Sequence, residues 1–237
     1  MIFFDLDGTL LDHKRSEFLG VKAFYEEYKD YFKLEEEIFH QIWCQISDKY
    51  FNSYLKGEVT FDQQRIERIK ELFNYSNIKI TDQDAIIKFK TYLRHYENNW
   101  KPFSDVIPCL EQLSGKYEIG IISNGDLEQQ SLKLEKMEIT QYFTNIITAG
   151  ELGISKPNTK IFSIACDRVN KKPQECYYIG DDFNTDILPC EEVGVNGIWL
   201  NRKHESLVID NIKMIYSLND LISTLSLEDE CQIGVVR

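Results

Sequence analysis

Hydrophobic residues recur at helical spacing through the first half of the chain. Between Val21 and Lys101 the only glycine is Gly57, and every proline lies at or after Pro102. The apolar residues of this stretch repeat every three or four positions: Ile38, Ile42 and Ile46; Ile66, Ile69 and Leu72; Ile86, Phe89 and Leu93. That period predicts amphipathic helices, since it places the apolar side chains on one helical face.

Two of these helices begin with capping signals. "TFDQ" starts at Thr60 and "TDQD" at Thr81, and each places a polar acceptor three residues after the threonine, as a capping box requires. Together with "EFLGVKAFYEEY" near its start, the segment predicts about four helices, which is enough for a small bundle.

The bundle contains several side chains that can fill its core or meet a substrate. We expect its aromatic residues to pack in the core: Trp43, Tyr50, Phe51 and Tyr54. Arg65 and Arg68 stand at i and i+3 spacing and are candidates for substrate contacts. A solvated helix face is the interpretation we favour for this pair.

Beyond Lys101 the pattern changes to short apolar strands that alternate with helical stretches. The predicted strands are "YEIGII", "NIIT", "CYYIG", "NGIWL" and "KMIYS", and the predicted helices cover 104–113, 126–137, 158–169, 185–193 and 218–225. This alternation is typical of βαβ units in a parallel, doubly wound sheet. "IFF" at residues 2–4 is one more such strand, so the helical segment is an insertion after it.

The sequence therefore predicts an α/β protein with two parts. Residues 1–14 and 100–237 form a Rossmann-like three-layer core around a parallel sheet, and residues 15–99 form an inserted α-helical bundle. The last residues, "EDECQIGVVR", are expected to be a tail or a peripheral strand.

Charge and composition restrict the partners. The chain has 237 residues, 43% of them hydrophobic, and a formal net charge of −12. This charge argues against binding to nucleic acid polymers or to anionic membranes. A small phosphorylated metabolite stays compatible with it, because a bound metal reverses the local field. A monomer or a homodimer is expected.

No apolar run approaches the roughly 20 residues that cross a bilayer. Between Met1 and Asp5 there are only Ile2, Phe3 and Phe4, a run too short for a signal-peptide core, so a cytoplasmic location is expected. The six cysteines have no C-x-x-C pair, and we interpret them as reduced structural thiols.

Polar residues follow four of the predicted strands. Asp5 and Asp7 follow the first strand. The residues that follow the other three strands lie in separate stretches of the chain: Ser123, Asn124 and Gly125; Lys156; Asp181, Asp182 and Asp186. Ligands of open α/β sheets bind at the carboxyl ends of the strands, so these side chains should converge there.

Such a set suits phosphoryl transfer. Clustered carboxylates repel one another unless a hard cation binds among them, and Mg²⁺ prefers oxygen ligands. An ammonium group, a hydroxyl and backbone N–H groups complement phosphate oxygens. A carboxylate in this position can attack phosphorus, and a second acid or base is needed to move protons.

Four short motifs, in this order, carry a resemblance to a known family. "DLDGT", "SNG", the lysine of "SKP" and "GDDFNTD" closely resemble the motifs of the haloacid dehalogenase superfamily, and the insertion resembles the helical cap of its first cap class. The resemblance implies that Asp5 is the nucleophile and Asp7 the general acid/base. Because the dehalogenases proper lack an acid at the second position, Asp7 makes the chain resemble the phosphatases instead.

The resemblance also implies the ligands. Mg²⁺ would be held by Asp5, the Asp7 backbone carbonyl and Asp181, with Asp186 supporting Lys156 or a metal-bound water. Ser123, Asn124 and Gly125 would bind phosphate, and Lys156 would neutralise charge between nucleophile and phosphate. Asp182 stands where many relatives carry serine, and we expect it to face solvent or support a ligand.

Within the phosphatases, "SYLKGEVTFDQQRIERIKELF" and "IISNGDLEQQSLKLEKM" most resemble the pyrimidine-nucleotidase branch, which acts on nucleoside 5'-monophosphates. One departure is Pro189-Cys190, where relatives carry Gly-Ala; Pro189 is expected to alter the start of its helix. The predicted activity is Mg²⁺-dependent phosphomonoester hydrolysis through an aspartyl phosphate.

Several alternatives stay open. A sugar-phosphate phosphatase or a phosphoglucomutase-type phosphotransferase shares these motifs and the cap class. A phospho-acceptor signalling receiver is disfavoured, because there the acidic pair precedes the acceptor aspartate. An inactive binding relative is disfavoured because every expected catalytic residue is present. A calcium loop at "DLDGT" fails, since Gly8 is at position 4 of the loop instead of position 6.

Overall fold

The structure is a computed structural model that describes residues 1–206 and 212–225. It contains two compact units, one formed by Met1–Asp12 with Pro102–Arg237 and the other by His13–Lys101. Both boundaries lie two residues outside the predicted limits of the insertion, 15–99, since the first helix of the second unit begins at His13. The predicted tail, 228–237, lies outside the described residues.

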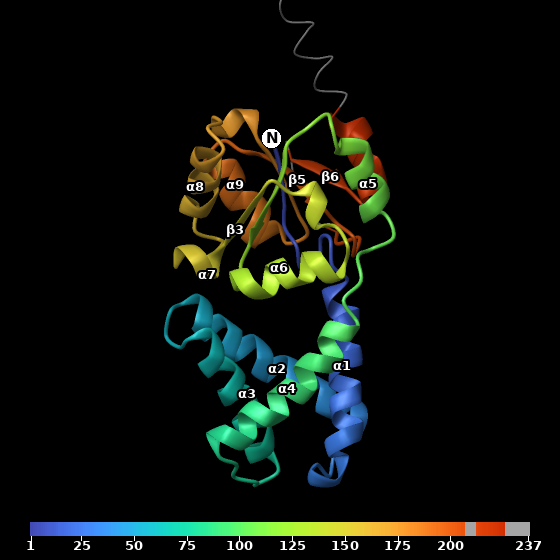
Figure 1. Ribbon diagram of the computed structural model, residues 1–237, viewed down its shortest axis with the longest axis vertical. Coiled ribbons are helices and arrows are strands. Elements are labelled where there is room, and N and C mark those ends of the chain that lie inside the picture. Colours follow the sequence, from blue (N-terminus) through green and yellow to red (C-terminus); the bar gives the residue numbers. More distant parts are fainter. Residues whose placement is uncertain (207–211, 226–237) are drawn as a thin grey trace, which may run out of the picture. The chain divides into compact units, whose positions relative to one another are not determined.

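Within the described residues of the first unit, six parallel strands form one sheet in the order β3-β2-β1-β4-β5-β6. The strands are β1 (Ile2–Phe4), β2 (Ile119–Ser123), β3 (Asn145–Thr148), β4 (Tyr177–Gly180), β5 (Asn196–Leu200) and β6 (Lys213–Ile215). Helices cover both faces of this sheet (Figure 1). The predicted Rossmann-like α/β fold is confirmed.

Helices or helical turns form in each of the predicted ranges, and α7 (Ala149–Leu152) is an additional short helix that was not predicted. They are α5 (Val106–Leu113), α6 (Leu127–Lys136), α7 (Ala149–Leu152), α8 (Lys160–Arg168) and α9 (Leu188–Glu192), with the short turns η2 (Thr140–Tyr142), η3 (Pro173–Glu175) and η5 (Leu218–Asp220). The single helix expected over 185–193 is instead a π-helical turn, η4 (Phe183–Ile187), followed by α9. Pro189 lies in the first turn of α9, directly after this π-helical turn.

Strand β1 has only three residues, and it is held by pairing along both of its edges. All three side chains are fully buried, and the strand pairs with β2 on one side and β4 on the other, with Ile2 opposite both Ile119 and Tyr177. The ladder continues one residue further, where Asp5 N–H donates to the Ile179 carbonyl at 2.8 Å. The Asp5 backbone is thereby fixed at the centre of the sheet edge.

The chain leaves the sheet through a tight turn. The N–H groups of Leu10 and Leu11 both donate to the Leu6 carbonyl, at 2.9 and 2.8 Å, and these leucine side chains are fully buried. The returning chain pairs with this turn, because Phe103 N–H donates to the Leu10 carbonyl at 3.0 Å. The ends of the insertion therefore lie side by side.

The second unit is a helical bundle made of α1 (His13–Tyr28), α2 (Glu36–Leu55), α3 (Phe61–Tyr75) and α4 (Asp82–Asn98), with the turn η1 (Lys29–Tyr31). Both predicted capping boxes form: Gln63 N–H donates to Thr60 Oγ1 at 3.1 Å, and Asp84 N–H donates to Thr81 Oγ1 at 3.2 Å. Among the described residues, no helix combines the length and apolar character needed to cross a membrane.

Aromatic rings fill the core of the bundle. Trp43 is 2% exposed and lies 4.3 Å from Tyr92 and 5.7 Å from Phe24 between ring centroids. The prediction that Trp43 is a core residue is confirmed. Tyr50, Phe51 and Tyr54 are only partly buried, so they line the edge of the bundle and do not form its centre.

The two arginines of α3 were predicted to be exposed to solvent, and both are less exposed than that. Arg68 is only 9% exposed, so a solvated face is wrong for this residue. Arg65 is partly buried, with its guanidinium 4.2 Å from the Phe61 ring centroid and 3.5 Å from an Asp62 oxygen. Burial lowers the pKa of Arg68. Within the described residues its guanidinium makes no hydrogen bond or ion pair, and Nε is fully buried without a partner.

Candidate active site

The site lies where the strand order reverses. Strands β1 and β4 are neighbours at the centre of the sheet, although the chain runs outward from them in opposite directions. Their carboxyl ends carry Asp5 and Asp181, and Ser123 ends the adjacent strand β2. Open α/β sheets bind ligands at this switch point, because the diverging loops leave a crevice there.

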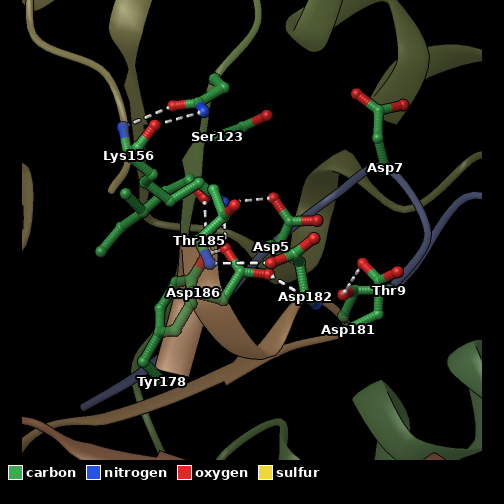
Figure 2. A network of polar contacts seen from close by, with 12 residues as sticks. Asp5, Asp7, Thr9, Ser123, Lys156, Tyr178, Asp181, Asp182, Thr185 and Asp186 are labelled. Carbon is green, nitrogen blue, oxygen red and sulfur yellow. Dashed lines mark hydrogen bonds and ion pairs between the residues drawn. The ribbon is translucent and has the colours of Figure 1, made fainter. Parts of the chain in front are cut away.

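Three carboxylates converge at this edge. Asp5, Asp181 and Asp186 each place one oxygen within 4.8 Å of the other two (Figure 2). Asp186 reaches the group from η4, one turn after the end of β4. The predicted convergence of these acids is present in the geometry.

Lys156 joins two of these acids. Its ammonium lies 2.7 Å from Asp5 Oδ1, 2.6 Å from Asp186 Oδ1 and 2.7 Å from the Tyr178 hydroxyl. The side chain is 3% exposed. Burial works against the charged ammonium, but the Asp186 and Asp5 carboxylates outweigh it and raise the pKa of Lys156, which keeps the group positively charged.

The cluster holds more negative charge than Lys156 balances. Burial, together with the Asp186 and Asp181 carboxylates, raises the pKa of Asp5 well above its usual range, even though Lys156 opposes the shift. Burial and Asp186 raise the pKa of Asp181 to about 6. A hard divalent cation with oxygen preference, such as Mg²⁺, fits this donor set because it removes the repulsion.

The oxygens of the three acids have different partners. Asp186 Oδ1 accepts from Lys156, and Asp186 Oδ2 accepts from Asp182 N–H at 3.2 Å, so both of its oxygens are engaged. Asp5 Oδ1 accepts from Lys156, whereas no group among the described residues donates to Asp5 Oδ2. The arrangement suits Asp186 as a supporting residue and leaves one oxygen of Asp5 for other chemistry.

Asp181 is held from two sides. Its backbone carbonyl accepts a hydrogen bond from the Trp199 indole at 3.1 Å, and its Oδ1 lies 3.4 Å from the Thr9 hydroxyl, which donates to it. Gly8 has φ +95°, and a Cβ there would stand 2.6 Å from Asp181 Oδ1. Glycine is therefore required at this position both by the backbone conformation and by the closeness of the carboxylate.

The predicted phosphate-binding residues surround the end of β2. Ser123 is 2% exposed, and its hydroxyl accepts a hydrogen bond from Gln130 Nε2 at 2.6 Å. The Asn124 side-chain amide is committed elsewhere: Nδ2 donates to the Lys156 carbonyl at 2.9 Å, and Oδ1 accepts from Lys156 N–H at 2.7 Å. This reciprocal pair fixes the Lys156 backbone, so Asn124 can serve phosphate only through its backbone N–H.

The Asp7 carboxylate lies apart from the acidic cluster. Figure 2 shows it turned away from the carboxylates of Asp5 and Asp181. Its oxygens each lie 2.7 Å from Lys133 Nζ, and Oδ2 also accepts from Gln130 Nε2 at 2.9 Å. A metal contact from Asp7 therefore could come only from its backbone carbonyl, as the resemblance implies.

Sequence reasoning missed three residues at the site: Tyr178, Gln130 and Lys133. The last two lie on the buried face of α6 with Leu134, and polar residues on the core-facing side of a helix are the signal that could have revealed them. Tyr178 is a buried strand residue without such a signal. Asp182 is exposed and caps η4 by accepting from Thr185 N–H at 2.7 Å.

Residues 1–194 match the profile of the haloacid dehalogenase-like hydrolases. This match covers most of the chain and includes all the site residues that the sequence predicted, from Asp5 to Asp186. The chain belongs to the haloacid dehalogenase-like hydrolase family. The family that the motifs indicated is thereby confirmed, and the protein is a hydrolase.

Relatives of this hydrolase act on different compounds. It is 28% identical over 222 residues to a glyceraldehyde 3-phosphate phosphatase of Methanothermobacter thermautotrophicus, covering 90% of each chain. It is 27% identical over 207 residues to the pyrimidine 5'-nucleotidase YjjG of Escherichia coli, covering 86% of each chain. The relatives therefore include a pyrimidine nucleotidase and a sugar-phosphate phosphatase at nearly the same sequence identity.

The fold agrees with solved structures of the family. The HAD-hydrolase YfnB of Bacillus subtilis, solved bound to magnesium, superposes with a TM-score of 0.80 at 20% identity and covers 95% of this chain and 97% of that one. This likeness establishes the arrangement of strands and helices in the hydrolase.

Proposed function

We propose that this hydrolase is a Mg²⁺-dependent phosphomonoesterase that acts through an aspartyl phosphate on Asp5. One observation carries the proposal: Asp5 Oδ1 is held at 2.7 Å by the buried Lys156 ammonium, while Oδ2 accepts no hydrogen bond from the described residues. A carboxylate fixed through one oxygen presents the other as a nucleophile. The phosphatase relatives support this reading.

The proposed reaction has two displacements. In the first, Asp5 Oδ2 attacks phosphorus, the ester P–O bond breaks, and the ester oxygen keeps the bonding electrons and takes a proton from Asp7 to leave as an alcohol. In the second, water attacks the phosphorus of the aspartyl phosphate and gives a proton to Asp7. Phosphate leaves and the Asp5 carboxylate is restored, so protons and atoms balance over the cycle.

The other residues hold the phosphoryl group. Ser123, the backbone N–H groups of Asn124 and Gly125, and Lys156 would neutralise its oxygens. Asp5, the Asp7 carbonyl and Asp181 would hold Mg²⁺, which supplies positive charge to the phosphoryl group when bound. Asp186 would keep Lys156 in place, as its 2.6 Å contact with the ammonium supports.

For the substrate we propose a small phosphorylated metabolite, and within that class a pyrimidine nucleoside 5'-monophosphate. The 27% identity to a pyrimidine 5'-nucleotidase over 86% of the chain supports this choice. A sugar phosphate is the second candidate, since the glyceraldehyde 3-phosphate phosphatase is 28% identical over a similar length. We further propose that the helical unit, residues 13–101, serves as the cap that selects between them.

Phosphate release from a panel of nucleotides and sugar phosphates, with Mg²⁺, tests both levels of the proposal. Turnover of pyrimidine deoxynucleotides above all others is expected. Turnover of sugar phosphates alone would overturn the nucleotide assignment and leave the phosphatase intact. Conversion of a hexose 1-phosphate to its 6-phosphate, without free phosphate, would instead establish a phosphotransferase.

The intermediate can be trapped. Rapid acid quenching with a ³²P-labelled substrate should give labelled protein whose label is released by hydroxylamine, as an acyl phosphate requires. Asp5→Asn should abolish the label. Label that survives this substitution would place the covalent step on another residue.

A further inference from the structure

Helix α6 holds the Asp7 carboxylate. Lys133 Nζ lies 2.7 Å from each oxygen of Asp7, and Gln130 Nε2 donates to Oδ2 at 2.9 Å. Both partners come from one face of α6, since they stand three residues apart. The position of Asp7 therefore depends on a helix whose contacting residue Gln130 is 123 positions further along the chain.

Gln130 also contacts the phosphate-binding hydroxyl. The same Nε2 atom that donates to Asp7 donates to Ser123 Oγ at 2.6 Å, and a side-chain amide has two protons for two acceptors. Gln130 is fully buried. A Cβ at Gly125 would collide with its side-chain amide, so glycine at this position leaves the space that the bridge between Asp7 and Ser123 occupies.

Stability does not explain Lys133. The residue is 2% exposed, and an ammonium group loses several kcal/mol of hydration when it is buried, which ion pairing recovers only in part. An apolar side chain of similar volume would pack at least as well beside the buried Leu134. A lysine at this position forms an ion pair with both Asp7 oxygens, which an apolar residue cannot do.

We propose that Lys133 and Gln130 are positioning residues that hold the Asp7 carboxylate at a fixed place beside Ser123. The inference rests on the proposed function, in which Asp7 moves the proton and Ser123 binds the phosphoryl oxygen. Lys133 fixes both oxygens of the proton-transferring group, and Gln130 ties that group to the hydroxyl that orients the phosphate. A displacement of about 1 Å in such a group costs about 10²-fold in rate.

The effect depends on the leaving group, which separates it from a structural role. A nitrophenolate leaves without a proton, whereas an alkoxide must receive one from Asp7. Lys133→Met should therefore lower kcat/KM for an alkyl ester, glycerol 2-phosphate, by about 10²-fold and should change kcat/KM for 4-nitrophenyl phosphate far less. Gln130→Met should also lower kcat/KM more for glycerol 2-phosphate than for 4-nitrophenyl phosphate, with an added loss common to both esters because Gln130 also contacts Ser123. This variant keeps the inference testable if Lys133→Met does not fold.

Two further variants sharpen the test. Lys136→Met changes an exposed lysine three residues further along α6, and it should leave kcat/KM for both esters unchanged. In the double variant Asp7→Asn/Lys133→Met, the alkyl-ester loss should be no larger than in Asp7→Asn alone, because Lys133 acts through Asp7.

The outcomes are distinguishable. Equal losses on both esters, no loss on either, or additive losses in the double variant would each overturn the positioning role while the phosphatase activity stands. A wild-type protein that releases phosphate from neither these esters nor the nucleotide and sugar-phosphate panel would overturn the proposed function itself.

Discussion

The Lys156 ammonium and the Asp5 carboxylate form a buried ion pair with atoms 2.7 Å apart, although 151 residues separate the two in the chain. The pair is possible because β2 is the neighbour of β1 in the sheet, and Asn124, directly after β2, holds the Lys156 backbone by two hydrogen bonds. It leaves one Asp5 oxygen without a hydrogen-bond donor among the described residues, and this oxygen is the proposed nucleophile.

Asp5→Asn should lower kcat by about 10⁴-fold or more, because an amide does not form the acyl phosphate. Steady-state phosphate release with the best substrate measures the effect. Asp182→Asn is the matched control: it makes the same chemical change at an exposed residue that caps η4, and its turnover should stay near that of the wild type. Full activity of Asp5→Asn would contradict the mechanism.

Removal of divalent metal with EDTA should stop turnover, and Mg²⁺ should restore it. The physical reason is the repulsion among Asp5, Asp181 and Asp186, whose oxygens lie within 4.8 Å of one another. Mg²⁺ at 100 times its Kd should also stabilise the fold by about 2.7 kcal/mol, which calorimetry detects without a substrate. A rate unaffected by EDTA would remove the metal from the mechanism, and Asp181→Asn should abolish the Mg²⁺-dependent stabilisation.

Asp105 should make the free energy of unfolding decrease as the pH falls into the acid range. It accepts two hydrogen bonds from Arg202, each at 2.9 Å, and two more from Ser217 and Leu218 N–H. Burial opposes the ionised form, but these bonds outweigh it and lower the pKa of Asp105. A lowered pKa contributes stability above the unfolded-state value of about 3.9, and the contribution is lost as the pH falls through the folded-state pKa.

Urea unfolding from pH 7 down to about pH 3 measures this contribution. Asp105→Asn should cost about 3 kcal/mol at neutral pH, because it leaves the Arg202 charge, on a side chain that is 16% exposed, without its partner. The cost should shrink as the pH falls. Asp62→Asn, at a carboxylate whose side chain is 86% exposed, is the control and should change little. A cost for Asp105→Asn that does not vary with pH would contradict the prediction.

Arg68→Met should stabilise the helical unit by about 1 kcal/mol. The arginine is 9% exposed and has no ion-pair partner among the described residues, whereas methionine fills the space without a buried charge. Calorimetry should show a rise of about 2–4 °C in the unfolding temperature. Arg65→Met is the control on the same helix, since its guanidinium already stacks on Phe61. A clear loss of stability in Arg68→Met would show that the charge has a structural partner.

The sequence alone determined the elements and the chemistry. Helical periodicity and the two capping boxes placed the bundle, because these are local interactions between residues three or four apart. Alternation of apolar strands with helices determined the parallel sheet. The acids after β1 and β4 were expected at one edge, since parallel strands carry their carboxyl ends to the same side.

Local pattern failed where distant residues decide a side chain's surroundings. Ile38 fits the helical period but is 44% exposed, because the period does not say how far the buried face extends. Arg68 was expected to be a surface residue and is only 9% exposed. The helix expected over 185–193 begins as a π-helical turn, which brings Asp186 back to Lys156.

Only the tertiary structure decided which lysine pairs with each acid. Asp5 and Asp7 stand two residues apart, and nothing local distinguishes their carboxylates. The fold brings Lys156 to Asp5 and Lys133 to Asp7 from two different elements, at 2.7 Å in each case. The sequence thus determines which groups are present at the edge of the sheet. Which lysine pairs with each carboxylate is determined by the packing of α6 and of the loop that carries Lys156. The reason is that both ion pairs join residues more than 100 positions apart in the chain.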